Sequence, residues 1–344
     1  MNTPKIAAMV GLATSLFVTA GAGAAEYNFK LHHFLGPQTP SHLETVAPWA
    51  EAIEKASDGR VEIEIFPSMS LGGTPPELVG QARDGVVDIV WTVNGYTAGL
   101  FPRTEVFELP FVHRNDPKAT NLAMHDLFED ELRQEYKGLE VMFLHVHQGN
   151  GLHTVDKEVR SPEDVAGLKI RTPSRTGAWT IEALDAAPAA MPVPSLPQAL
   201  SKKTVDAAFV PFEIIPSLKL EQQTNYQIEG ADQTRFGTLV FQMSMNKGRW
   251  DALPEDIQQI FKDHSGPEWL AHLGQVWAEN DDEGIAQAIA AGNTHIVLDQ
   301  AQTDAFEKAL EPVIARWVDE ATKSGIDGEG LLQKARAAIE KHVE

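Results

Sequence analysis

Two hydrophobic periodicities alternate along the chain after about residue 26. Apolar residues occupy every second position in Val61-Glu-Ile-Glu-Ile65, which is typical of a strand, whereas Leu43, Val46, Ala50 and Ile53 keep helical spacing. Ser41-His-Leu-Glu44 has the form of a capping box that starts this helix. The pattern predicts strands at 28–34, 61–65 and 87–91, and helices from Ser41 and from about Pro75. This β-α-β-α-β order favours a parallel sheet covered on both faces.

The stretch from Gly167 to Glu213 repeats this order. Its first strand runs from Leu168 to Arg171 and matches 61–65; a helix-length segment, a Pro-rich loop and a second helix follow. The last strand stops at Val210-Pro211-Phe212. A Val-Asp pair precedes the last strand in each half, at Val87-Asp88 and Val205-Asp206. The repeat predicts two α/β lobes of related build.

Later segments are expected to join the lobes. A strand at 141–147, followed by a turn at 148–151, predicts a first crossing, and the strand at 237–245 predicts the return. Residues 268–291 have the pattern of a long helix, whose Trp277 we expect in the core. Pro312 should kink or divide the following helix. We assign residues 26–150 and about 238–280 to lobe I, and 151–237 and about 281–344 to lobe II.

The strand ends predict a binding cleft. Open α/β sheets bind ligands beyond the carboxyl ends of their strands, so facing lobes would bring Phe34, Trp91, Arg171 and Phe212 together. The planar guanidinium of Arg171 can hold a carboxylate through two hydrogen bonds. On spacing alone, a structural ion pair between Arg171 and a surface carboxylate remains an alternative.

Composition limits the classes of function. The chain has 28 Lys and Arg against 49 Asp and Glu, a net charge of −21, which argues against binding nucleic acid or anionic membrane. It has no cysteine, so disulfides, thiolate nucleophiles and thiolate metal sites are excluded. An acidic protein that binds an anion must concentrate its few cations locally, which adds weight to Arg171. We expect a monomer.

The N-terminus has the pattern of a cleaved export signal. Lys5 precedes an apolar run from Ile6 to Ala20, and small residues follow up to Ala25. The run is short for a membrane span, although an uncleaved anchor is the alternative. We therefore expect a signal peptide at 1–25 and a periplasmic mature chain from about Glu26.

No catalytic or metal-binding pattern stands out. His145-x-His147 places two imidazoles on one face of a strand, but a zinc site needs a third ligand and no H-E-x-x-H spacing occurs. G-x-S-x-G, P-loop and G-x-G-x-x-G motifs are also missing. We expect no enzyme, no metal and no cofactor.

Six stretches in order resemble the DctP-type solute-binding proteins of tripartite ATP-independent periplasmic (TRAP) transporters. They include GRVEIEIFPSMSLGG, QARDGVVDIVW, FPRTEVFELPF, GLKIRTP, 199–212 and MSMNKGRWDALPEDIQQ. The resemblance implies two α/β lobes joined by crossing strands and a long helix, with the ligand in the cleft between the lobes. It also implies hinge closure on an organic acid, an arginine clamp at Arg171, and delivery to a small and a large membrane subunit for ion-driven uptake.

The chain departs from this family at two places. Gln148-Gly-Asn-Gly151 stands where many members carry a second arginine, and Phe212 lies where many have an asparagine loop. These changes remove polar partners and add an aromatic ring, so a C4-dicarboxylate would be poorly paired. They favour a monocarboxylate, with an aromatic acid such as a hydroxybenzoate slightly ahead of a keto, hydroxy or sugar acid.

The predicted ligand site combines the clamp, aromatic walls and polar groups for ligand hydroxyls. Its members are Arg171, Phe212, Trp91, Phe34, Phe236, His33, Asn94, Asn150 and His153. Structural roles remain the alternative for the four polar groups, and a cation beside Glu213 is left open. A sensory receptor as partner in place of a transporter would leave the same fold and pocket.

Overall fold

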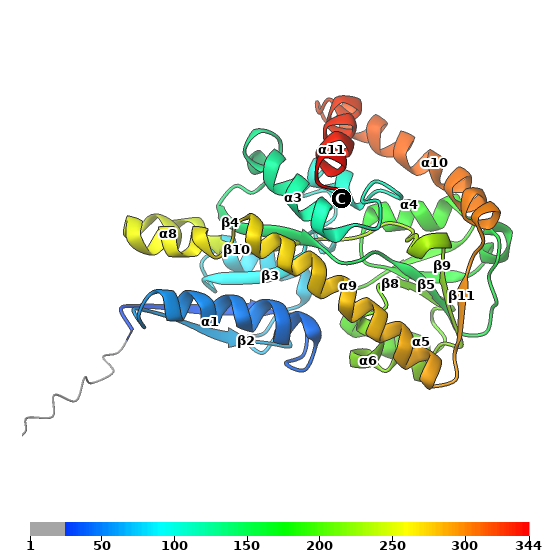
Figure 1. The fold of residues 1–344 in the computed structure, drawn as a ribbon, viewed down its shortest axis with the longest axis horizontal. Coiled ribbons are helices and arrows are strands. Elements are labelled where there is room, and N and C mark those ends of the chain that lie inside the picture. Colours follow the sequence, from blue (N-terminus) through cyan, green and yellow to red (C-terminus); the bar gives the residue numbers. More distant parts are fainter. Residues whose placement is uncertain (1–24, 344) are drawn as a thin grey trace, which may run out of the picture.

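The computed structural model describes residues 25–343 and contains two sheets with helices packed around them (Figure 1). The signal peptide predicted for 1–25 lies outside the described residues except for Ala25. We call the part built on the first sheet lobe I and the part built on the second sheet lobe II.

The first sheet has the strand order β2-β1-β3-β10-β4. Its strands are β1 (Tyr27–His33), β2 (Val61–Phe66), β3 (Ile89–Val93), β4 (Leu139–Val146) and β10 (Val240–Asn246). β1 pairs in parallel with β2 and β3, and its buried Leu31 lies between Ile65 and Ile89. β10 is antiparallel to β3 and β4, so the sheet is mixed, not wholly parallel as the pattern predicted.

The second sheet has the order β11-β9-β5-β8-β6-β7. Its strands are β5 (Gly151–Thr154), β6 (Lys169–Thr172), β7 (Ala187–Ala190), β8 (Ala207–Val210), β9 (Tyr226–Glu229) and β11 (Thr294–Val297). β6 is parallel to β7 and β8, and Arg171 pairs with Ala189 and Ala208.

Eleven α-helices occur in the described part of the chain. They are α1 (Ala47–Ala56), α2 (Leu78–Arg83), α3 (Pro117–Leu127), α4 (Arg175–Ala183), α5 (Leu196–Ser201), α6 (Ile214–Leu218), α7 (Lys247–Asp251), α8 (Glu255–Asp263), α9 (Pro267–Ala290), α10 (Gln300–Lys323) and α11 (Gly328–His342). None of the described helices is both long and apolar enough to cross a bilayer.

The two Val-Asp pairs have the same structural role in the two lobes. The Asp88 carboxylate accepts the backbone N–H of Lys30 at 2.8 Å, and the Asp206 carboxylate accepts that of Lys169 at 2.9 Å. Each aspartate therefore ties the start of β3 or β8 to the neighbouring central strand. Strand β3 begins at Ile89, two residues later than predicted.

The predicted repeat is shifted by one strand. β6 lies between β7 and β8, just as β1 lies between β2 and β3, so the strand that contains Arg171 corresponds to β1 and not to β2. The error arose because β7, Ala-Pro-Ala-Ala, has neither alternation nor β-branched residues and was not predicted.

The predicted connections are present. The chain passes from β4 in the first sheet to β5 in the second, and returns from β9 to β10. Helix α9 packs against α3 and β4 of lobe I and against α6 and β11 of lobe II, and Figure 1 shows it crossing both lobes. Helix α10 continues through Pro312 without being divided.

Two details of the helices differ from expectation. The Ser41–Glu44 capping box does not form: residues 41–46 make a π-helical turn, and the Glu44 carboxylate accepts a hydrogen bond from Asn280. The C-terminal helix α11, placed with lobe II in the predicted division, packs against α3 of lobe I (Figure 1). The residue boundaries of the lobes remain a prediction.

Candidate functional site

A small pocket lies between the lobes, with a volume of about 30 Å³. This is room for about two water molecules, so a ring-sized ligand requires the walls to separate further. Its lining comes from both lobes, from the crossing strands and from α9: Phe34, Leu35, Val93, Tyr96, His147, Arg171, Val193, Val210, Pro211, Glu213, Ile214, Leu239, Phe241 and Trp277.

Arg171 is the cation of this pocket. Strand β6 places it in the interior, where it is 2 % exposed. Its Nε donates to the carbonyl of Met191 at 3.0 Å and its Nη1 to the carbonyl of Phe209 at 3.3 Å, which fixes the plane of the guanidinium. Its Nη2 is buried and has no hydrogen-bond partner among residues 25–343.

No carboxylate among residues 25–343 forms an ion pair with Arg171, so the alternative of a structural surface pair does not hold for the described chain. Burial lowers the pKa of Arg171, but a guanidinium keeps its charge in proteins. A buried charge without a counter-ion is costly. An anionic ligand at Nη2 would remove this cost.

The Tyr96 hydroxyl lies beside the guanidinium and accepts the backbone N–H of Val193 at 3.1 Å. Burial raises the pKa of Tyr96, so its phenol is neutral and its O–H remains available as a donor. Tyr96 belongs to lobe I and Val193 to lobe II, so this bond also joins the lobes beside the clamp.

Aromatic rings form the wall on the side of lobe I and α9. Phe34 stacks on Trp91 at 5.2 Å between ring centroids, and Trp91 stacks in turn on Phe241 at 5.0 Å. Trp277 lies 5.5 Å from Phe241. Phe34, Phe241 and Trp277 line the pocket, while Trp91 lies outside the lining and stacks on Phe34 and Phe241. Flat apolar faces of this kind suit an aromatic ligand body.

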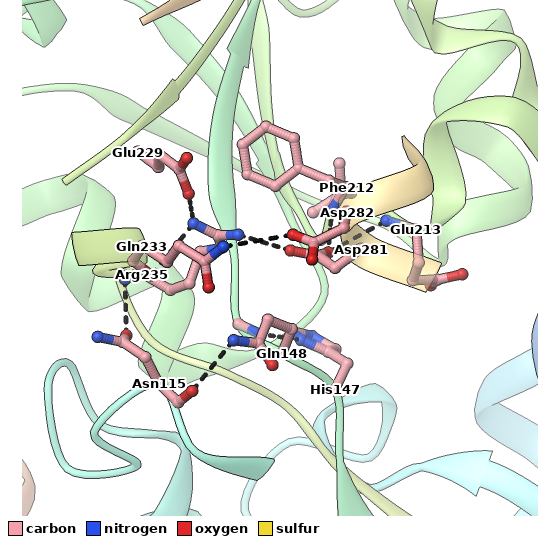
Figure 2. A network of polar contacts seen from close by, with 12 residues as sticks. Asn115, His147, Gln148, Phe212, Glu213, Glu229, Gln233, Arg235, Asp281 and Asp282 are labelled. Atoms are coloured by element: carbon pink, nitrogen blue, oxygen red, sulfur yellow. Dashed lines mark hydrogen bonds and ion pairs between the residues drawn. The ribbon is translucent and has the colours of Figure 1, made fainter. Parts of the chain in front are cut away.

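A buried ionic network holds the turn at Phe212 and Glu213 (Figure 2). Asp281 of α9 accepts the backbone N–H groups of both residues, at 2.7 and 3.1 Å. Arg235 bonds Asp281 at 2.6 Å, pairs with Glu229 and lies 4.6 Å from the centre of the Phe212 ring. The network therefore ties α9 and the returning crossing segment to the pocket wall.

A second set of contacts joins the lobes next to β6. Arg175, the first residue of α4, forms a two-pronged ion pair with Glu105 of lobe I, at 2.7 and 2.6 Å. Thr176 donates to the Glu108 carboxyl at 3.0 Å. We call these contacts the interlobe latch.

The structure brings Arg171 and Phe34 of the predicted site into the pocket lining, and the other seven predicted residues lie outside it. Three have different polar partners: His33 bonds His42, Asn94 bonds Tyr136 and Gln242, and His153 bonds the Val210 carbonyl. Trp91 bonds His145, and Phe236 packs on Phe209 and Phe306. Phe212 lies against Arg235, while the Oδ1 of Asn150 has no partner in the described chain. Ligand contact by these seven stays a prediction.

Sequence reasoning missed several pocket residues. Tyr96 follows the carboxyl end of β3, and the strand-end rule that selected Phe34 could have found it. Leu239 and Phe241 alternate along the returning strand, which is a usable signal. Trp277 lies in the core as expected, and it also lines the pocket from the middle of α9. A position within a long amphipathic helix gives no hint of this.

A wider groove of about 280 Å³ lies on lobe I alone, between α3, β4 and the start of α9. It lacks residues of lobe II, so closure of the lobes would not enclose a ligand there. Among the described residues no group of three or more His, Asp or Glu side chains could hold a metal ion.

Comparison with known proteins agrees with this architecture. Residues 31–320 match the model of the DctP family, bacterial extracellular solute-binding proteins of family 7. A TRAP solute-binding protein from Rhodoferax ferrireducens, solved with copurified benzoate, is 38 % identical with a TM-score of 0.89, covering 92 % of this chain and 98 % of that one.

Two further relatives show the range of ligands. A marine metagenome TRAP solute-binding protein specific for aromatic acids, solved with 3-hydroxybenzoate, is 34 % identical with a TM-score of 0.90, covering 93 % of this chain and 100 % of that one. The C4-dicarboxylate-binding protein of Rhodobacter capsulatus is 25 % identical over 90 % of this chain and 92 % of its own. The family and these neighbours are substrate-binding transport proteins. The chain belongs to the DctP family and is a TRAP-type solute-binding protein with a two-lobed α/β fold.

Proposed function

We propose that this solute-binding protein captures an aromatic monocarboxylate and passes it to the two membrane subunits of a TRAP transporter. The proposal includes export by the N-terminal signal, action as a monomer in the periplasm and closure of the lobes on the ligand. The observation that carries it is the Arg171 guanidinium, which is buried in an aromatic pocket and whose Nη2 has no partner in the described chain.

The pocket favours one carboxylate over two. Arg171 is the only Lys or Arg among its described lining residues, so a second carboxylate would lack a charged partner. Most of the remaining lining is aliphatic or aromatic, which leaves the several hydroxyls of a sugar acid short of partners. The relatives solved with benzoate and with 3-hydroxybenzoate support the same choice.

Calorimetry and thermal shift with benzoate, 3-hydroxybenzoate, succinate and glucuronate test the proposal. We expect the two aromatic acids to bind more tightly than the other two and to raise Tm. In Arg171→Met the free energy of binding should become less favourable by about 2–5 kcal/mol, which is the usual loss when one partner of a buried charge pair is truncated. The ligand-free Tm should rise, because an unpaired buried charge is removed.

Arg160→Met is the matched control, because Arg160 is exposed and pairs with Glu158 at the surface. It should leave both the affinity and the ligand-induced shift unchanged. Tighter binding of succinate than of benzoate would contradict the aromatic ligand. An unchanged shift in Arg171→Met would contradict the clamp.

A further inference from the structure

His147 and Glu213 are two polar pocket residues that the clamp does not use. They lie on different elements, His147 directly after β4 and Glu213 directly before α6. His147 is fully buried, and Glu213 is 3 % exposed. His147 Nε2 and Glu213 Oε2 have no hydrogen-bond partner in the described part of the chain, although both residues line the pocket.

The hydrogen bonds of His147 settle where its proton lies. Its Nδ1 accepts the backbone N–H of Gly149 at 2.9 Å, so that nitrogen carries no proton. Burial and the nearby His113 and His145 hold the pKa of His147 well below its usual value, and the ring is neutral. The single proton is therefore on Nε2, which presents a fixed N–H donor to the pocket.

Glu213 is held so that its carboxyl avoids the ionic network. Asp281 accepts its backbone N–H, while Figure 2 shows the side chain directed away from Arg235 and Asp281. Burial and the Asp281 charge raise the pKa of Glu213 well above its usual value. This shift favours the protonated carboxyl, which can both donate and accept a hydrogen bond.

A ligand hydroxyl matches this pair of groups. A hydroxyl can accept a hydrogen bond from the His147 Nε2–H, and it can donate one to the carbonyl oxygen of Glu213. A bare benzoate ring would leave both unpaired, and an unpaired buried polar group is costly. The four groups predicted from the sequence to bond ligand hydroxyls lie outside the pocket lining, whereas His147 and Glu213 belong to it; those four are His33, Asn94, Asn150 and His153.

We propose that His147 and Glu213 form a second polar subsite, which binds a hydroxyl group on the ligand body and makes the protein prefer hydroxylated aromatic monocarboxylates over benzoate. This inference rests on the function proposed above and narrows its substrate class.

Calorimetry with benzoate, 3-hydroxybenzoate and 4-hydroxybenzoate tests the subsite through the ratio of affinities. The wild-type protein should bind one hydroxybenzoate at least about 10-fold more tightly than benzoate. In Glu213→Leu and in His147→Phe this preference should fall to about 3-fold or less. Glu213→Gln, which keeps a donor and an acceptor, should retain most of it.

Ile214→Val is the matched control, because it trims an apolar pocket residue next to Glu213 and should weaken both ligands alike. Unfolding curves of each variant show whether it is folded, and Glu213→Gln keeps the shape of the side chain if Glu213→Leu does not fold. Suppose that benzoate binds through Arg171 but the wild-type protein shows no preference for hydroxybenzoate, or that every variant keeps the preference. The subsite is then refuted, and the proposed function stands. If no aromatic acid binds, both fall.

Discussion

Glu108 shows how one buried residue couples stability to pH. Its carboxyl is 3 % exposed, accepts the backbone N–H of Val240 at 3.1 Å and bonds the Thr176 hydroxyl. Burial, with the charge of Glu105, raises the pKa of Glu108 to about 8. The folded protein therefore keeps a proton that the unfolded chain loses above its ordinary pKa of 4.5.

The sign of the effect follows from this difference. Between pH 4.5 and 8 the folded state binds more protons, so this group lowers the free energy of unfolding as pH rises, by about 1.4 kcal/mol per pH unit. In Glu108→Gln the amide imitates the protonated acid and removes the slope. Urea unfolding at pH 5, 6, 7 and 8 should show a stability gap in favour of the variant that widens with pH.

Glu62→Gln, on an exposed position of β2, controls for the loss of one negative charge. Its free energy of unfolding should vary with pH in the same way as that of the wild-type protein. A constant gap between Glu108→Gln and wild type across this pH range would show that Glu108 is ionised in the folded state.

At the residue scale, sequence reasoning found the charge of the pocket but little of its wall. Arg171 could be predicted because an arginine at the end of a strand, in a chain with few cations, favours an anion-binding site. Tyr96, His147 and Glu213 reach the pocket from a turn, a crossing segment and a helix start. Their directions depend on how the lobes pack, which local periodicity does not encode.

At the scale of elements, α9 depends on a glycine. A Cβ on Gly284 would lie 2.1 Å from the carbonyl oxygen of Phe212, closer than real contacts allow. We expect Gly284→Ala to lower the free energy of unfolding by about 1–3 kcal/mol and to weaken ligand binding, because the turn at Glu213 must move. Chemical unfolding and calorimetry measure the two effects.

Gly80→Ala in α2 is the matched control, since its added Cβ meets no atom within 4 Å. It should raise stability by up to about 1 kcal/mol through helix propensity. Equal effects of the two substitutions would contradict the close packing of α9 on the pocket turn.

Elements with strong periodicity were predicted well, and weak ones were not. The strand at 61–65, the crossing strands and the long helix carry clear alternation or helical spacing, and the structure contains all of them. Strand β7 is short and consists of Ala and Pro, so only its pairing with β6 defines it. The packing of α11 on α3 is a tertiary choice with no local signal.

At the scale of the whole molecule, the interlobe latch should favour the closed form. Arg175→Gln removes the two-pronged bond to Glu105, whose carboxylate is mostly buried. A smaller closed population raises the apparent Kd in proportion, and we expect about a 3- to 10-fold weaker affinity for benzoate. Calorimetry gives the affinity, and small-angle scattering should show a larger radius of gyration without ligand.

Arg316→Gln controls for this change, because Arg316 pairs with Glu182 within lobe II. It should alter neither the affinity nor the radius of gyration. An Arg175→Gln protein with wild-type affinity would show that the latch does not bias closure.

The place of β10 has a consequence for the order in which the protein can fold. This strand lies between β3 and β4, yet it follows all strands of the second sheet except β11 in the chain. During synthesis or translocation, β3 and β4 therefore have open edges until most of lobe II has emerged. The sheet of lobe I is begun first but can be completed only after β10 has emerged. The N-terminal half of the chain therefore depends on the C-terminal half to complete its sheet.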